Sequence, residues 1–415
     1  MKSDLDILLE TLPPESRETA RALWAGMPAD MRRELTLTLG AFVGLLRQRP
    51  GTAADLVKLI RRLAAPVYAP VTKVAIVGPV NVGKSTLFNV LVNDPELQAE
   101  VSPIPGTTRA ALTSDKGLFA LVDTPGADRP QTMGLEERER AFKAAAGADF
   151  LLIVLDATVG VNTSARILFG ELKALGKPYL VCLNKIDMVT GKLKAEVVRS
   201  AAQVLDLDPE SVVPVSAQEG NGVERLLLEL AAAEPRLLGK LGEVLTPLRR
   251  KLGWQAVRRA AVASGLVALS PIPILDLIPL TAIQATMVLT LARIYGRELT
   301  WKRGLEILAT FGAGLLGRTL FQQLSKFGGV PGWALSASVA SSATVAIGFA
   351  VMRWFETGQK PTHKDMLEVA SQTQKALTAK LRGKKPGKKQ LTEELEELLP
   401  EVTRQLDPED APRPE

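Results

Sequence analysis

The chain has 415 residues, a formal net charge of +6, one cysteine (Cys182) and one histidine (His363). At roughly 100–200 residues per domain, this length predicts two or three domains, with a core large enough to fold without disulfides or structural metal. The single cysteine excludes an intrachain disulfide framework and a Cys-cluster zinc site. The charge is mildly basic for this size and indicates little by itself about nucleic acid.

The N-terminal region, residues 1–65, is expected to be helical. Apolar residues recur at helical spacing between positions 56 and 63, with basic residues between them. We interpret the region as a helical arm or cap without catalytic residues. Residues 1–4 lead into an acidic amphipathic start instead of an apolar run, so we expect no signal peptide and a cytoplasmic location for the domain that follows.

Residues 71–234 have the pattern of an α/β domain. Amphipathic stretches of helical length separate most of the short apolar runs, which are 74–77, 118–122, 150–155, 179–183 and 212–215. Alternation of this kind predicts βαβ units and a mostly parallel sheet with helices on both faces. The nearly continuous apolar character of the runs is typical of strands buried on both faces.

The first apolar run leads into a phosphate-binding pattern, GPVNVGKS, which extends from Gly78 to Ser85. An apolar-periodic helix follows, which is the context that this motif requires. Its glycines let backbone N–H groups surround the phosphates, and the helix N-terminus adds positive potential. We expect Lys84 to contact the β- and γ-phosphates and the Ser85 hydroxyl to ligate Mg²⁺.

The second run ends in DTPG, from Asp123 to Gly126. In this position after a phosphate loop, Asp123 can hold Mg²⁺ through water, and the Gly126 N–H can sense the γ-phosphate. Alone, the pattern would indicate only a turn.

A base-reading motif, NKID, follows the fourth run and ends at Asp187. The Asp187 carboxylate can accept two hydrogen bonds from the N1–H and N2–H₂ edge of guanine, and adenine lacks that pair of donors. Ser216 and Ala217 follow the fifth run and fit the loop whose backbone N–H meets guanine O6.

Taken together, these motifs identify a resemblance. Residues 71–234 resemble the Era/TrmE branch of translation-factor-related GTPases, on GPVNVGKS, PGTTR (105–109), DTPG, NKID and SA. The resemblance implies binding of GTP and GDP with Mg²⁺, hydrolysis of GTP, and Thr108 as the switch I threonine. The nucleotide-binding residues expected are Gly78, Asn81, Val82, Gly83, Lys84, Ser85, Thr86, Thr108, Asp123, Gly126, Asn184, Lys185, Asp187, Ser216 and Ala217. The metal ligands expected are Ser85, Thr108 and Asp123.

Three positions bear on hydrolysis. Ras-like and Gα proteins place a water-orienting Gln after the DxxG glycine, and this chain has Ala127 there. Gln131 aligns with the glutamate of TrmE-like proteins, so we assign no catalytic residue and expect slow turnover. Asn81 matches the asparagine that ligates K⁺ in TrmE-like GTPases; it either does so here or only shapes the loop, and both readings stay open.

The resemblance also implies a homodimer through the G domain.

Residues 245–356 carry the excess hydrophobicity. The segments 260–275, 277–292 and 327–352 contain no charged side chain. This part resembles a bacterial domain of unknown function that is appended to Era-like GTPases and occurs in membrane-associated proteins. The segment 327–352 is long enough to span about 30 Å of hydrocarbon.

The long segment also has a small-residue face, because Ser336, Ala340, Thr344 and Gly348 recur every four residues. We expect residues 250–356 to contact membrane lipid at the cytoplasmic face. The alternative is a soluble helical bundle whose buried helices are apolar all round.

Residues 357–415 are predicted to be a charged, flexible tail, because a basic run is followed by an acidic patch. The leading hypothesis is a GTPase switch coupled to a membrane-associated helical domain. One alternative is an Era-like ribosome-assembly or RNA-associated GTPase; the basic tail supports it weakly, and the missing RNA-binding fold opposes it. Another is a scaffold that binds GTP without useful turnover.

Overall fold

The computed structural model describes residues 73–92, 119–121, 142–268, 277–312, 332–381 and 387–407, together with Leu63 and Val67. The chain forms two compact units. The sheet unit comprises Tyr68–Leu252 with Pro412–Glu415, and the helical unit comprises Met1–Val67 with Gly253–Ala411. Apart from Leu63, the predicted N-terminal helical region lies outside the described residues.

The sheet unit contains five parallel strands in the order β2-β1-β3-β4-β5. Their bounds are Val74–Val77 (β1), Phe119–Leu121 (β2), Phe150–Asp156 (β3), Tyr179–Asn184 (β4) and Val212–Pro214 (β5). The strands coincide with the five apolar runs, so the predicted parallel α/β sheet is confirmed. Asp156 pairs with Asn184 in the register of β3 and β4, which puts the polar ends of these two strands side by side.

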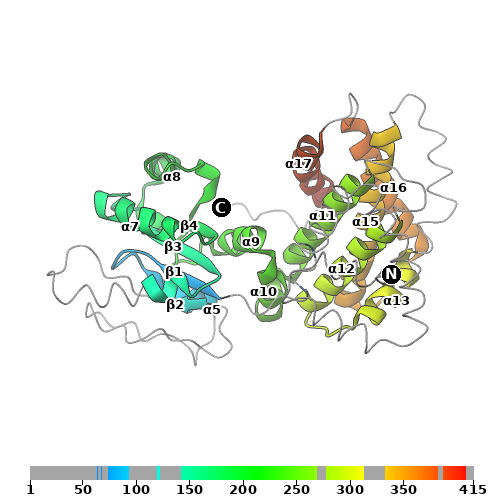
Figure 1. Ribbon diagram of the computed structural model, residues 1–415, viewed down its shortest axis with the longest axis horizontal. Coiled ribbons are helices and arrows are strands. Elements are labelled where there is room, and N and C mark those ends of the chain that lie inside the picture. The colour runs from blue at the N-terminus through cyan, green and yellow to red at the C-terminus, as the bar shows by residue number, and fades with distance from the viewer. Residues whose placement is uncertain are drawn as a thin grey trace, which may run out of the picture. The chain divides into compact units, whose positions relative to one another are not determined.

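Helices cover both faces of this sheet, with α7 and α8 on one side and α5 on the other (Figure 1). The bounds are Lys84–Val92 (α5), Thr163–Ala174 (α7), Gly191–Leu205 (α8), Val223–Ala233 (α9) and Leu238–Val244 (α10). Short 3-10 helices are η1 (Ile186–Met188), η2 (Pro209–Ser211), η3 (Pro235–Leu237) and η4 (Thr246–Leu248). Because β3 is buried along its whole length, it forms the centre of the core. The predicted domain ends at residue 234, whereas this compact unit continues through α10 and η4 and ends at Leu252.

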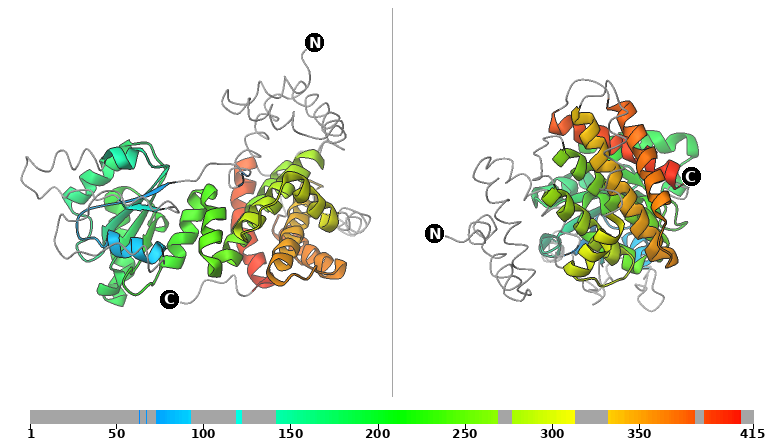
Figure 2. Two further views of the ribbon diagram at one scale, coloured as in Figure 1. Left: turned by 90° about the horizontal axis from the view of Figure 1, so that it is seen from below. Right: turned by 90° about the vertical axis from the view of Figure 1, so that its right-hand side faces the viewer.

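The described part of the helical unit consists of helices, which Figure 2 shows from two further sides. Their bounds are Arg249–Ala268 (α11), Leu277–Ile294 (α12), Trp301–Gly312 (α13), Gly332–Thr357 (α15), His363–Lys380 (α16) and Lys388–Leu406 (α17). The boundary between the two units falls within α11. Helix α15 is the centre of the unit, because α12, α13 and α16 all pack against it.

Part of the small-residue face of α15 lies close to α11. The Ser341 hydroxyl donates to the Ala261 carbonyl at 2.9 Å, and the Thr344 hydroxyl donates to Ser264 Oγ at 2.8 Å. A Cβ on Gly348 would lie 2.4 Å from a methyl group of Val257. Two of the four residues of that face, Thr344 and Gly348, thus lie close to α11, and the hydroxyl groups of Ser341 and Thr344 are hydrogen-bonded within the unit.

One described helix, Trp333–Thr357, is long and apolar enough to cross a membrane, with a mean hydropathy of 1.7 over its most apolar window. The core helix of a soluble protein can have the same length and composition. In this structure 78% of that window is buried. Both readings of the apolar region, membrane contact and soluble bundle, therefore remain predictions.

The segment expected to be a flexible tail instead forms α16 and α17. A capping box begins α16, because the side chains of Thr362 and Asp365 each accept the other residue's backbone N–H. Buried apolar side chains of α17 recur at helical spacing, at Leu391, Leu395, Leu398, Leu399 and Val402. The charges lie between these positions, so the charge pattern reflects amphipathic helices.

Trp254 in α11 is hydrogen-bonded to the residue that follows α17. Its indole N–H donates to the Asp407 carboxylate at 2.6 Å, and both residues are buried. A buried indole needs such a partner, because an unpaired N–H away from water is costly. The contact joins the residue that follows α17 to the first turns of α11.

Candidate functional site

The phosphate-binding loop lies between β1 and α5, as predicted. Gly78 and Gly83 have positive φ angles of 150° and 87°, and Asn81 has a φ of 65°. At Gly78 a Cβ would lie 2.1 Å from the Val154 carbonyl oxygen, so no side chain fits there. These residues give the loop a tight path that ends at the first turn of α5.

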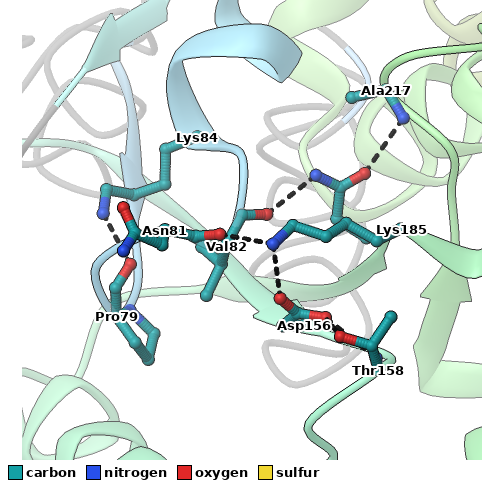
Figure 3. Close-up of polar contacts among 9 residues, drawn as sticks. Pro79, Asn81, Val82, Lys84, Asp156, Thr158, Lys185 and Ala217 are labelled. Atoms are coloured by element: carbon teal, nitrogen blue, oxygen red, sulfur yellow. Dashed lines mark hydrogen bonds and ion pairs between the residues drawn. The ribbon is translucent and has the colours of Figure 1, made fainter. Parts of the chain in front are cut away.

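Lys84 begins α5 and is 6% exposed. Its Nζ donates to the carbonyl oxygen of Gly78 at 2.9 Å. It also donates to the carbonyl oxygen of Pro79 at 2.7 Å (Figure 3). These bonds fix the ammonium group within the loop. Ser85 and Thr86 follow in the first helical turn, where backbone N–H groups have no partner within the helix and the helix dipole favours an anion.

Asn184, at the end of β4, connects this loop to the loop after β5. Its Nδ2 donates to the Val82 carbonyl at 2.8 Å, and its Oδ1 accepts the Ala217 N–H at 3.0 Å. Asn184 is buried, so both bonds lie away from water. A Cβ on Gly83 would lie 2.4 Å from Asn184 Nδ2, which explains why the loop needs glycine at this position.

Lys185, the next residue, connects the same loop to the end of β3. Its Nζ donates to the Asn81 carbonyl at 2.5 Å and to Asp156 Oδ2 at 2.6 Å (Figure 3). Asp156 Oδ1 accepts the Thr158 N–H at 2.8 Å and the Thr158 hydroxyl at 2.6 Å. Burial alone would raise the pKa of Asp156, but the hydrogen bonds from Lys185 and Thr158 outweigh burial and lower the pKa, so the carboxylate is ionised at neutral pH.

Asp187 lies in η1, directly after β4, and is half-buried. Its Oδ1 is buried and has no hydrogen-bond partner. A buried carboxylate oxygen without a donor is costly, so this atom is free to accept a bond from a ligand. The hydroxyl of Ser216, in contrast, accepts the Glu219 N–H at 3.1 Å and serves the local turn.

The structure brings the predicted residues of three motifs together at one edge of the sheet. They are Gly78, Asn81, Val82, Gly83, Lys84, Ser85, Thr86, Asn184, Lys185, Asp187, Ser216 and Ala217. Thr108, Asp123 and Gly126 lie outside the described residues, and so do Ala127 and Gln131. Ser85 is thus the one predicted metal ligand that the described part includes. Within that part, no group of three or more His, Cys, Asp or Glu residues could hold a metal ion.

Sequence reasoning missed Asp156 and Thr158. An acidic residue ending an otherwise apolar strand was the available signal, because β3 reads FLLIVLD. Cys182, in β4, is a buried free cysteine. Burial raises the pKa of its thiol, which keeps it neutral and unreactive.

Comparisons with known proteins agree with this geometry. Residues 73–185 match the family described as "50S ribosome-binding GTPase", and residues 238–382 match "Domain of unknown function (DUF697)". GTPase Der of Syntrophobacter fumaroxidans is 36% identical over 178 residues, which cover 41% of this chain and 38% of that protein. The tRNA modification GTPase MnmE of Thermotoga maritima is 40% identical over 161 residues, which cover 37% and 34%.

Among solved structures, Era of Aquifex aeolicus bound to GDP·AlF₄⁻ has 25% identity and a TM-score of 0.34, and the match covers 49% of this chain and 69% of that one. The chain spans little more than a third of the length of the Der and MnmE relatives named above. The sheet unit contains a P-loop GTPase domain similar to those of Der and MnmE, and residues 238–382 match a DUF697 domain.

Proposed function

We propose that the chain is a Mg²⁺-dependent switch that binds and hydrolyses GTP and couples its nucleotide state to a membrane-associated helical unit. The observation that carries the nucleotide part is the unpartnered Asp187 Oδ1 beside the Asn184 and Lys185 contacts. An acceptor in this place matches the N1–H and N2–H₂ donors of guanine. Adenine offers no such pair, so the site favours GTP over ATP.

Mg²⁺ fits the donor set expected at this site. It is a hard cation that prefers oxygen ligands and retains water, and the Ser85 hydroxyl lies at the start of α5 beside the loop that would hold the phosphates. Thr108 and Asp123 would complete the protein ligands. The metal would neutralise charge on the phosphate oxygens, while Lys84 and the α5 N-terminus hold them in place.

Nucleotide binding and turnover test this proposal directly. We expect the purified chain to bind GDP at least about a hundredfold more tightly than ADP, because the ADP base would leave Asp187 unpaired. We expect Mg²⁺-dependent release of phosphate from GTP, faster in KCl than in NaCl if Asn81 ligates K⁺. Turnover per molecule that rises with protein concentration would support a homodimer through the G domain. Equal affinity for GDP and ADP would contradict the guanine assignment.

The membrane part of the proposal is supported by the length and hydropathy of α15. We expect the full chain to float with anionic liposomes in a density gradient, and to resist release by high salt, because apolar contact is not screened. The amount that floats should differ between GDP and a non-hydrolysable GTP analogue. A chain that stays monodisperse and fails to float in both states would contradict membrane association at the cytoplasmic face and favour the soluble bundle.

A second candidate is association with the ribosome or another RNA. The description of the family that residues 73–185 match, a 50S ribosome-binding GTPase, favours it. Co-sedimentation with purified ribosomal subunits in each nucleotide state would support this candidate, and failure to co-sediment at low salt would exclude it.

A further inference from the structure

We propose that Asp156 is a positioning residue of the guanine nucleotide site, acting through Lys185 on the Asn81 turn of the phosphate loop. The inference rests on the proposed function. None of the sequence motifs contains Asp156, which ends β3 and lies 29 residues before Lys185. The register of β3 and β4 brings the two residues together, because Asp156 pairs with Asn184.

The Lys185 ammonium is held by two partners. It lies between two acceptors from different segments, the Asn81 carbonyl and Asp156 Oδ2. A lysine side chain has many rotamers, so holding it in one place needs strong partners. The carboxylate supplies a charge-assisted bond of 2.6 Å, which is stronger than a bond to a neutral acceptor.

Asp156 is itself held in place by Thr158. Both Thr158 donors bind Oδ1, which leaves Oδ2 aimed at Lys185 (Figure 3). The side chain of Asp156 is 9% exposed, whereas that of Lys185 is 30% exposed. The acceptor of this pair is therefore held in place and largely buried, unlike the carboxylate of an ion pair between two solvated side chains.

The Asp156–Lys185 pair lies beside two segments of the proposed nucleotide site, the phosphate loop and the start of η1. Asn81 has a left-handed backbone at the tip of the phosphate loop, and Lys185 is two residues before Asp187. Asn184 holds the same loop one residue further on, at Val82. Asn184 and Lys185 therefore each connect the start of η1 to the phosphate loop. Asp156 holds the second of these connections, the one from Lys185 to Asn81. A site arranged before the ligand arrives loses less entropy on binding.

Asp156→Asn tests the proposal with little change of shape. The variant keeps an oxygen for Thr158 but presents a neutral group to the Lys185 ammonium. We expect the GDP dissociation constant to rise about 10- to 100-fold, from the loss of a hydrogen bond between charged groups. The KM for GTP should rise with it while kcat stays within about twofold, because the residue does not touch the reacting phosphate.

Asp149→Asn is the matched control. Asp149 directly precedes the same strand at its other end, where its carboxylate accepts the Lys73 N–H at 2.9 Å. We expect this variant to bind GDP within about twofold of the wild type, because it removes a carboxylate at the opposite end of β3, away from the site. Thr158→Val should weaken GDP binding, and Thr158→Ser, which keeps the hydroxyl, should restore it.

A double-mutant cycle separates positioning from general support of the fold. If Asp156 acts through Lys185, then adding Asp156→Asn to Lys185→Met should cause no further loss of GDP affinity. Additive losses, or wild-type GDP affinity in Asp156→Asn, would overturn the proposal. Because the wild-type chain is measured first, failure of that chain to bind GDP would instead overturn the proposed function.

Discussion

Asp187→Asn should turn the guanine site into one that prefers xanthine. The unpartnered Oδ1 of Asp187 is replaced either by an NH₂ group that faces the donors of guanine or by a single amide oxygen. Xanthine carries an oxygen acceptor where guanine carries its N2–H₂ donor, so the amide suits it. We expect affinity for GDP to fall at least about a thousandfold, as in sites built to hydrogen-bond one polar group, and xanthosine diphosphate to bind in its place.

Titration calorimetry with both nucleotides measures this exchange. Asp208→Asn provides the control, since Asp208 is exposed and its side chain makes no cap hydrogen bond at η2. It should leave affinity for GDP unchanged. If Asp187→Asn binds GDP as tightly as the wild type, then Asp187 does not contact the base, and the guanine assignment is wrong.

Gly83→Ala should abolish nucleotide binding by displacing Asn184. The new Cβ would lie 2.4 Å from Asn184 Nδ2, at a backbone φ of 87° that side chains rarely adopt. Moving Asn184 breaks its bonds to Val82 and Ala217. We expect about a hundredfold or greater loss of affinity for GDP, and a free energy of unfolding lower by about 2–4 kcal/mol from strain and a lost buried bond.

Gly160→Ala separates these two effects. Gly160 also has a positive φ, of 69°, but nothing lies within 4 Å of its added Cβ. It should cost about 1–2 kcal/mol of stability from backbone strain and leave GDP binding intact. Chemical denaturation and GDP titration of both variants check this. Equal GDP affinity in the two variants would show that the Gly83–Asn184 contact does not matter for the site.

The phosphate loop and the NKID motif could be predicted because each is continuous in sequence and lies at the end of an apolar run. Parallel strands bring such ends to one edge of a sheet. The role of Asp156 could not be predicted in this way. Its partner lies on the next strand, so the contact depends on the β3–β4 register, which sequence alone does not fix.

The C-terminal segment shows the opposite difficulty. Its blocks of like charge favoured a flexible tail, although Leu391, Leu395 and Leu399 already had the spacing of one helix face. The helical spacing of the apolar residues was overlooked because charged residues surround them, and only a narrow stripe of α17 is buried. In the helical unit, the small-residue face of α15 was predictable, but its partner helix α11 was not, since many helices can accept such a face.

The contact between Trp254 and Asp407 has a consequence for synthesis of the chain. The two residues are 153 positions apart, so at roughly 5–20 residues per second a ribosome needs about 8 to 30 s to deliver Asp407 after Trp254. The sheet unit is fully translated by then, apart from its last four residues. Its nucleotide site can therefore form on the nascent chain before the helical unit can complete its core with Asp407. During this interval the apolar surface of the helical unit is most exposed to aggregation and to chaperones.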